Sequence, residues 1–209
     1  MDHKTLKPNE LKALRYIRNE IVHKGHSPSV RDVQGILGYE SPRTALIAID
    51  GLIDKKYLKR KLDKTLQLLS DLPDEMNYGR TVNVPLVGYV SCGLPMLAEE
   101  NIEAMVPVSD KLAKPGSRYF LLRAMGDSMN KAGICNRDLV LVRQQPTADD
   151  GQKVVALIDD EAIIKEFHRT PEAVVLRPKS TNKKYQPIIL NNDFVIQGVV
   201  VATLPASAY

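Results

Sequence analysis

Cysteine is scarce in this chain, whose 209 residues include only Cys92 and Cys135. The two lie far apart and no CxxC spacing occurs, which argues against a zinc site or a disulfide framework. Such sparing use of cysteine fits a reducing cytoplasm. We therefore expect no metal and no other cofactor.

Long apolar runs are also missing. The longest nearly apolar stretch, residues 194–204, is too short to cross a bilayer. The first residues are polar and charged, unlike a signal peptide. Repeats and low-complexity tracts are absent, and the 44% of hydrophobic residues can bury a core. These features predict a globular cytoplasmic protein with no membrane partner.

Acidic residues are outnumbered in the first third of the sequence. Residues 1–66 hold 14 Lys and Arg against 8 Asp and Glu, a formal charge of +6 within a total of +4. Residues 67–209 carry 15 against 17, a formal charge of −2. A basic module on a mildly acidic remainder suggests binding to a polyanion. A solvated, Lys-rich helix face is the alternative.

The same basic third is predicted to form three helices. Leu11, Leu14, Ile17 and Ile21 recur at helical spacing, and the chain breaks at residues 25–28. Ser29 and Asp32 resemble a capping box, and Gly38 ends the second helix. Ser41 and Pro42 open a third helix that runs to about residue 55. The expected apolar positions are Val30, Val33, Ile36 and Leu37 in the second helix and Ala45, Leu46, Ile49, Leu52 and Ile53 in the third.

Two short helices joined by a tight turn are typical of a helix-turn-helix. Residues 57–62 and 65–69 follow as a hairpin pattern with basic residues near its tip, which would make the wing of a winged helix-turn-helix. We expect residues 1–70 to be this DNA-binding domain. A three-helix bundle with a solvated hairpin is the alternative.

In the DNA-binding interpretation, the third helix presents an outward face to the major groove. Arg43 could pair with a guanine edge, and Ile47 could touch a thymine methyl. Ser41 and Thr44 share that face. The basic residues expected at phosphates are Lys55, Lys56, Lys59, Arg60 and Lys61.

The remainder of the chain changes character. Residues 71–81 are mostly polar, contain Pro and Gly and show no clear period, which predicts a linker. Residues 82–209 contain short segments rich in Val and Ile with turns between them, which predicts an all-β domain. The predicted strands are residues 139–143, 153–158, 162–168, 173–176 and 194–202. The fold class is therefore α+β, in two domains.

Ser128 lies beside Gly126 after an apolar run, as a nucleophile on a tight turn does. Of the four histidines, only His168 lies outside the DNA-binding module. Strand alternation places Lys165 on a face with Ile163 and Phe167, while His168 points the other way. A poorly solvated lysine has a lowered pKa and can take a serine proton. A lysine that extends to water is the alternative.

Taken together, the motifs resemble LexA and its relatives, the self-cleaving repressors and mutagenesis proteins with a Ser-Lys peptidase domain. The resemblance spans essentially the whole chain. Its motifs are residues 27–31 and 41–42, 84–88, 92–95, 101–103, 126–129, and 155–161 with Lys165.

This resemblance implies a LexA-like or signal-peptidase-like fold for residues 82–209 and a Ser128–Lys165 dyad. The substrate would be the chain itself, cut between Cys92 and Gly93. The implied trigger is a RecA filament on single-stranded DNA formed after DNA damage, and the implied target is operator DNA bound by a homodimer. The chain would then repress the DNA-damage (SOS) genes.

One departure concerns the third helix, because well-studied family members carry polar or acidic residues where this chain has Leu46 and Ile47. The operator sequence of those family members therefore cannot be assumed for this chain. A phage regulator, or a constitutive repressor whose dyad is little used, is the alternative function. A peptidase that acts on other proteins is a further one.

Overall fold

The computed structural model describes residues 6–70, 80–88, 97–159, 161–191 and 194–206. The chain divides into two compact units, Met1–Leu86 with Ile102–Ser109, and Val87–Asn101 with Asp110–Tyr209. Within the described residues, no helix is long and apolar enough to span a membrane.

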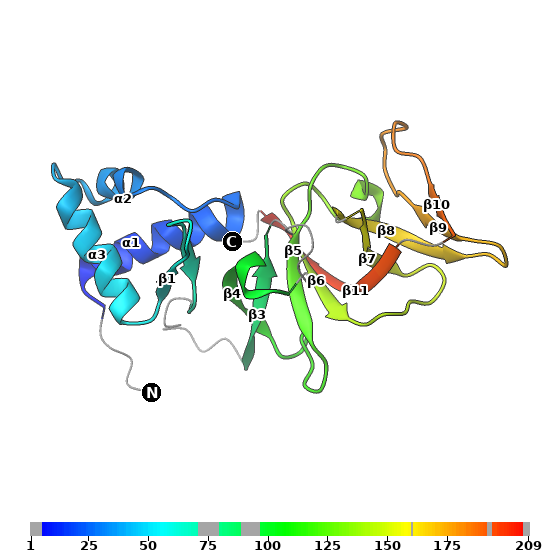
Figure 1. Cartoon of the computed structure of the whole chain (residues 1–209), viewed down its shortest axis with the longest axis horizontal. Coiled ribbons are helices and arrows are strands. Elements are labelled where there is room, and N and C mark those ends of the chain that lie inside the picture. Colours follow the sequence, from blue (N-terminus) through cyan, green and yellow to red (C-terminus); the bar gives the residue numbers. More distant parts are fainter. Residues whose placement is uncertain (1–5, 71–79, 89–96, 160, 192–193, 207–209) are drawn as a thin grey trace. The chain divides into compact units, whose positions relative to one another are not determined.

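The first unit contains helices α1, α2 and α3 (Figure 1). Helix α1 spans Pro8–Asn19 and continues into the π-helical turn η1, Glu20–Lys24. Helix α2 spans Val30–Leu37 and α3 spans Pro42–Asp54. The predicted helices are thus confirmed. Their fully buried side chains include Leu14, Ile17, Val33, Ile49 and Leu52.

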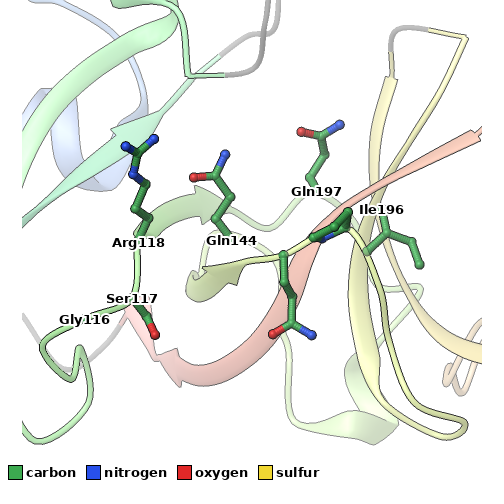
Figure 2. A pocket seen from close by; sticks show the side chains of 8 residues that line it. Gly116, Ser117, Arg118, Gln144, Ile196 and Gln197 are labelled. Atoms are coloured by element: carbon green, nitrogen blue, oxygen red, sulfur yellow. The ribbon is translucent and has the colours of Figure 1, made fainter.

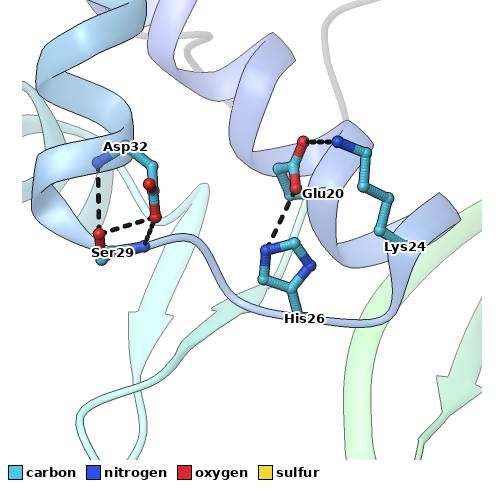
Figure 3. A network of polar contacts seen from close by, with 5 residues as sticks. All are labelled: Glu20, Lys24, His26, Ser29 and Asp32. Carbon is cyan, nitrogen blue, oxygen red and sulfur yellow. Dashed lines mark hydrogen bonds and ion pairs between the residues drawn. The ribbon is translucent and has the colours of Figure 1, made fainter.

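Local side chains fix where α2 begins. The Asp32 carboxylate accepts a hydrogen bond from the Ser29 backbone N–H at 2.8 Å, and Ser29 Oγ accepts one from the Asp32 N–H at 3.3 Å (Figure 3). The Ser29 hydroxyl also donates to the Asp32 carboxylate, at 2.7 Å, and this bond and the one from the Ser29 N–H lower the pKa of Asp32. Before α2 in the sequence, Glu20 Oε1 accepts a hydrogen bond from Lys24 Nζ at 2.6 Å, and Glu20 Oε2 lies 3.2 Å from His26 Nε2 (Figure 3). The predicted capping box is therefore confirmed.

Two apolar positions predicted to be buried are exposed instead. Ile36 is 40% exposed and Leu46 is 37% exposed. Short helices bury only a narrow stripe. Val33 and Leu37 already fill that stripe on α2, and Ala45, Ala48, Ile49 and Leu52 fill it on α3.

A hairpin follows α3, as predicted. Its strands are β1, Leu58–Arg60, and β2, Leu66–Leu68. The Asp63 carboxylate accepts from the Thr65 N–H at 2.9 Å and so stabilises the turn. The Leu66 N–H donates to Ser27 Oγ at 2.8 Å, which ties the hairpin to the segment before α2.

Two strands beyond the hairpin complete the first unit's sheet. Strand β3 spans Thr81–Val87 and β4 spans Ile102–Ser109. Strand β4 lies beside β3 and pairs in parallel with β2 at Ala104 and Leu68. Neither strand was among the segments predicted individually. The proposed boundaries at residues 70 and 81 remain predictions.

The second unit contributes seven strands to the sheet, in the order β5-β6-β11-β7-β8-β9-β10, and neighbours among them run antiparallel. Its strands are β5 (Tyr119–Arg123), β6 (Leu139–Gln144), β7 (Lys153–Ile158), β8 (Glu161–Arg169), β9 (Val174–Arg177), β10 (Ile188–Leu190) and β11 (Phe194–Leu204). Two 3-10 turns, η2 (Glu99–Asn101) and η3 (Asn130–Ala132), complete the unit. The β-rich prediction is confirmed.

Strand β11 bends to pair with both β6 and β7. Its register shifts between Ile196 and Gly198 and again between Val200 and Ala202. Gly198 is in the paired part of both ladders, opposite Gln144 and Val155. A Cβ added there would lie 2.3 Å from the Arg143 carbonyl oxygen, so the close approach of β6 requires glycine.

Gly198→Ala should therefore destabilise the second unit by about 1–3 kcal/mol, because backbone rather than a flexible side chain must move. Thermal unfolding measures the effect. Val195→Ala, on the same strand at a side chain that is 57% exposed, is the control and should change little. An unchanged unfolding midpoint for Gly198→Ala would contradict this packing.

Candidate functional site

A tight turn after β5 carries Ser128. Gly126 has φ +78°, a left-handed conformation that favours glycine, and its N–H donates to Asn136 Oδ1 at 2.9 Å. Ser128 is partly exposed, whereas the next residue, Met129, is only 3% exposed. The turn thus presents the hydroxyl while its neighbour anchors it in the core.

One apolar cluster connects this turn to β8. Met129 and Ile134 pack in the same buried cluster as Phe120, Val155 and Ile164. Ile164 directly precedes Lys165 on β8. Because the residue after Ser128 and the residue before Lys165 share one core, the two polar side chains are brought to the same place.

Lys165 reaches Ser128 directly. Its Nζ lies 3.0 Å from Ser128 Oγ and also donates to the Ile164 carbonyl at 3.0 Å. The lysine pairs across the ladder with Val154 and is only 9% exposed. Desolvation by this burial lowers the pKa of Lys165 below its ordinary value of 10.5.

His168 interacts with two carboxylates and not with Ser128. Its Nε2 lies 2.6 Å from Glu166 Oε1 and its Nδ1 lies 3.2 Å from Asp150 Oδ2. Burial alone would raise the pKa of Glu166, but hydrogen bonds from Lys179 and His168 outweigh it and lower that pKa. The structure therefore places Lys165, not His168, at the serine.

The arrangement can perform nucleophilic chemistry. A charged Lys165 donates to Ser128 Oγ, whereas a neutral amine has a lone pair that can accept the serine proton. The residues predicted as the cleavage site, Cys92 and Gly93, lie outside the described residues. In the described part of the chain, no cluster of three His, Cys, Asp or Glu side chains could hold a metal.

Sequence reasoning missed one group of residues around the turn. The segment of residues 179–185, between β9 and β10, contacts residues 127–131 through backbone and side-chain hydrogen bonds. The segment has no apolar periodicity, and no motif marked it. The one sequence signal that could have indicated the contact is the carboxylate of Asp127, directly before Ser128, because a carboxylate beside a tight turn needs hydrogen-bond donors.

The predicted base-reading residues occupy the start of α3. Ser41 caps the helix, its Oγ accepting from the Arg43 N–H at 3.3 Å. Arg43 is exposed, Thr44 is half-buried and Ile47 is 62% exposed. Arg43 and Ile47 are four residues apart and so share a face.

The predicted phosphate-binding residues differ in how exposed their side chains are. Lys55 pairs with the buried Glu10, and its side chain is only 16% exposed. Lys55 thus connects α3 to α1 within the protein, which leaves its ammonium group poorly placed to contact phosphate. The other predicted residues lie just after α3 or on β1 and beside it, where Lys56, Lys59 and Arg60 are exposed and Lys61 is half-buried.

A polar pocket in the second unit lies apart from these residues. It has a volume of about 480 Å³ and is lined by Gly116, Ser117, Arg118, Gln144, Gln145, Pro146, Ile196 and Gln197 (Figure 2). None of the candidate catalytic residues lines it. Its lining offers amide and guanidinium groups but no nucleophile paired with a base.

Comparison with known proteins identifies the family. Residues 85–201 match the Peptidase S24-like family, and this range includes Ser128 and Lys165. The LexA repressor of Alkaliphilus oremlandii is 38% identical over 203 residues, covering 95% of this chain and 97% of that protein. The chain belongs to the LexA repressor family. The LexA repressor of Bacillus subtilis is 37% identical, covering 93% of this chain and 95% of its own length.

Family membership confirms the resemblance drawn from the motifs. It extends over both units, since the LexA repressor of Bacillus velezensis also aligns with 93% of this chain at 36% identity. It makes the chain a member of a self-cleaving serine peptidase family.

The burial of Lys165 has a consequence for stability. Between the lowered folded-state pKa and the ordinary 10.5, the unfolded chain binds more protons than the folded chain. The free energy of unfolding therefore rises with pH in that window, by about 1.4 kcal/mol for each unit of pKa lowering.

Lys165→Met removes this titration, so the variant should be more stable than its parent at neutral pH. The difference should shrink as the pH approaches 10.5. Urea unfolding at several pH values measures it, with both chains carrying Ser128→Ala to exclude cleavage. Identical pH dependence of the two chains would show that Lys165 is not desolvated.

Proposed function

We propose that this chain is a LexA-type repressor of DNA-damage (SOS) genes. It binds operator DNA as a dimer and inactivates itself by cutting its own Cys92–Gly93 bond. The observation that carries the proposal is the 3.0 Å approach of buried Lys165 Nζ to Ser128 Oγ in a chain of the LexA family.

The proposed cleavage step uses the contact between Ser128 and Lys165. Neutral Lys165 takes the Ser128 proton as Oγ attacks the carbonyl carbon of Cys92. Backbone N–H groups near Ser128, including its own, stabilise the oxyanion. The lysine then protonates the Gly93 nitrogen as the peptide bond breaks, leaving an ester between Ser128 and Cys92. Water hydrolyses this ester and releases the N-terminal fragment.

The residue types at the bond suit this reaction. Cys92 is small enough for a tight pocket beside Ser128. Gly93 lets the backbone bend and approach the attacking oxygen. Because nucleophile and substrate belong to one chain, the attack is unimolecular once the loop docks, so a modest nucleophile suffices.

The trigger in this proposal is a RecA filament on single-stranded DNA. The filament acts by favouring the docked form of the loop, which is a population shift and needs no new catalytic group. A docked loop also excludes water from Lys165, which favours the neutral amine.

The DNA-binding part is a winged helix-turn-helix within residues 1–70. Helix α3 enters the major groove, where exposed Arg43 pairs with a guanine edge and Ile47 contacts a thymine methyl. Ser41 and Thr44 lie at the same end of the helix. The exposed or half-buried basic residues after it, Lys56, Lys59, Arg60 and Lys61, contact phosphates.

Dimerisation through residues 82–209 couples two such modules on a two-fold operator. A cut at Cys92 separates each module from its dimerisation domain. Each half-site is then bound alone and avidity is lost, which ends repression.

The exposed Leu46 and Ile47 favour an operator sequence of this chain's own over one shared with well-studied family members. A constitutive repressor with an unused dyad is less well supported. Burying a lysine amine against a serine costs stability, and such a repressor would gain nothing from it.

The purified chain should cut itself once, between Cys92 and Gly93, at alkaline pH or with activated RecA filaments. Mass spectrometry of the fragments locates the bond. Gly93→Asp should block the reaction by placing bulk and charge where the backbone must approach Ser128, while DNA binding survives. Ser128→Ala is the control; equal cutting in that variant, or a cut elsewhere, would refute the assignment.

DNA recognition should separate into two kinds of contact. Arg43→Ala should cost ~1–3 kcal/mol on the selected operator and relax preference at one position. Lys59→Ala should weaken binding to all sequences and reduce the salt slope by about one. Lys55→Ala is the contrast, because its ion pair with Glu10 predicts lost stability rather than a lost phosphate contact. If selection from random duplexes enriches no motif, the DNA-reading proposal is wrong.

A further inference from the structure

The turn that carries Ser128 is bonded along its length to residues 179–185. The Lys179 N–H donates to the Ser128 carbonyl at 2.9 Å, and the Lys131 N–H donates to the Lys179 carbonyl at 2.8 Å. Asn130 Nδ2 donates to Thr181 Oγ1 at 2.8 Å, and the Thr181 N–H donates back to Asn130 Oδ1 at 2.9 Å. These bonds hold the nucleophile's own peptide and the start of η3.

The residue before Ser128 is held by the same segment. The Tyr185 hydroxyl donates to Asp127 Oδ1, and Asn182 Nδ2 donates to Asp127 Oδ2 at 3.3 Å. The Tyr185 bond is the leading cause of the lowered pKa of Asp127. A Cβ at Gly126 would lie 3.3 Å from the Tyr185 oxygen, so the tyrosine packs closely over the turn.

The segment also reaches the strand that carries the base. Lys179 Nζ lies 2.9 Å from Glu166 Oε1, and Glu166 directly follows Lys165 on β8. Lys179 therefore bonds to both sides of the pair, through its backbone to Ser128 and through its side chain to the neighbour of Lys165.

We propose that residues 179–185 are a positioning segment that sets the aim of Ser128 Oγ towards the scissile carbonyl and towards Lys165. Tyr185 and Thr181 are its positioning residues, acting through Asp127 and Asn130. The inference rests on the proposed self-cleavage. Their loss lowers the rate of the chemical step, because displacing a reacting group by about 1 Å can cost about a hundredfold in rate.

The alternative is that the segment only keeps the turn folded. The two roles differ in what the pH profile and the unfolding midpoint report. A positioning role lowers the maximal rate at high pH, where Lys165 is neutral, and leaves the pH at half-maximal rate unchanged. A purely structural role lowers the rate only as far as the thermal unfolding midpoint falls.

Two variants remove one hydrogen bond each with little change of shape. Tyr185→Phe deletes the hydroxyl that Asp127 accepts from, and Thr181→Val deletes the oxygen that Asn130 donates to. Thr181→Ser keeps that oxygen and serves as the conservative rescue. Tyr119→Phe is the matched control, a partly exposed tyrosine on β5 outside this network.

Self-cleavage of the full chain is followed from neutral to strongly alkaline pH, with thermal unfolding of each variant in the Ser128→Ala background. Tyr185→Phe and Thr181→Val should lower the maximal cleavage rate about tenfold. The pH at half-maximal rate and the thermal unfolding midpoint should both stay at their wild-type values. Thr181→Ser and Tyr119→Phe should cleave like wild type.

Wild-type maximal rates for Tyr185→Phe and Thr181→Val would overturn the positioning role. So would a rate loss matched by a lower unfolding midpoint, or a shifted pH midpoint, which would mean action through the charge of Lys165. If wild type does not cleave, or Ser128→Ala does, the self-cleavage proposal itself fails and this inference falls with it.

Discussion

The site depends on one shared apolar core. Met129 and Ile164 are buried in the same cluster, and each is the chain neighbour of one member of the polar pair, Ser128 and Lys165. Burial on either side therefore fixes the approach of Oγ and Nζ. The same burial removes water from the amine and lowers the pKa of Lys165, so packing both assembles the pair and makes the lysine a potential base.

Packing brings Ser128 and Lys165 together but does not bring a substrate to them. The protein can therefore stay intact while these two side chains are already in contact. Lys165 Nζ already contacts Ser128 Oγ within the second unit, whereas the bond proposed as the substrate, Cys92–Gly93, lies earlier in the sequence. Control can then act on loop docking, which requires only a population shift. In the proposed mechanism the cut lies after the DNA-binding module and before Ser128 and Lys165, so that one broken bond separates DNA recognition from dimerisation.

Sequence patterns predicted the features that depend on local chemistry. Helical spacing and the Ser29–Asp32 cap located α2, and alternation on β8 separated Lys165 from His168. Contacts between residues far apart in the sequence could not be predicted from these patterns. Lys55 looked like a surface cation until Glu10, 45 residues away, proved to be its partner, and residues 179–185 carry no pattern that reveals their contact with Asp127. Leu46 is exposed because a helix of 13 residues has only one face against the core.

The central claim is that Lys165 is the base for Ser128. Its most direct test is the rate of self-cleavage without an activator, from neutral to strongly alkaline pH, for wild type, Lys165→Arg and His168→Ala. The account predicts that wild type and His168→Ala cleave faster as the pH rises. Lys165→Arg should be inactive throughout, because a guanidinium does not lose its proton. Cleavage by Lys165→Arg, or an inactive His168→Ala, would contradict the Ser-Lys mechanism.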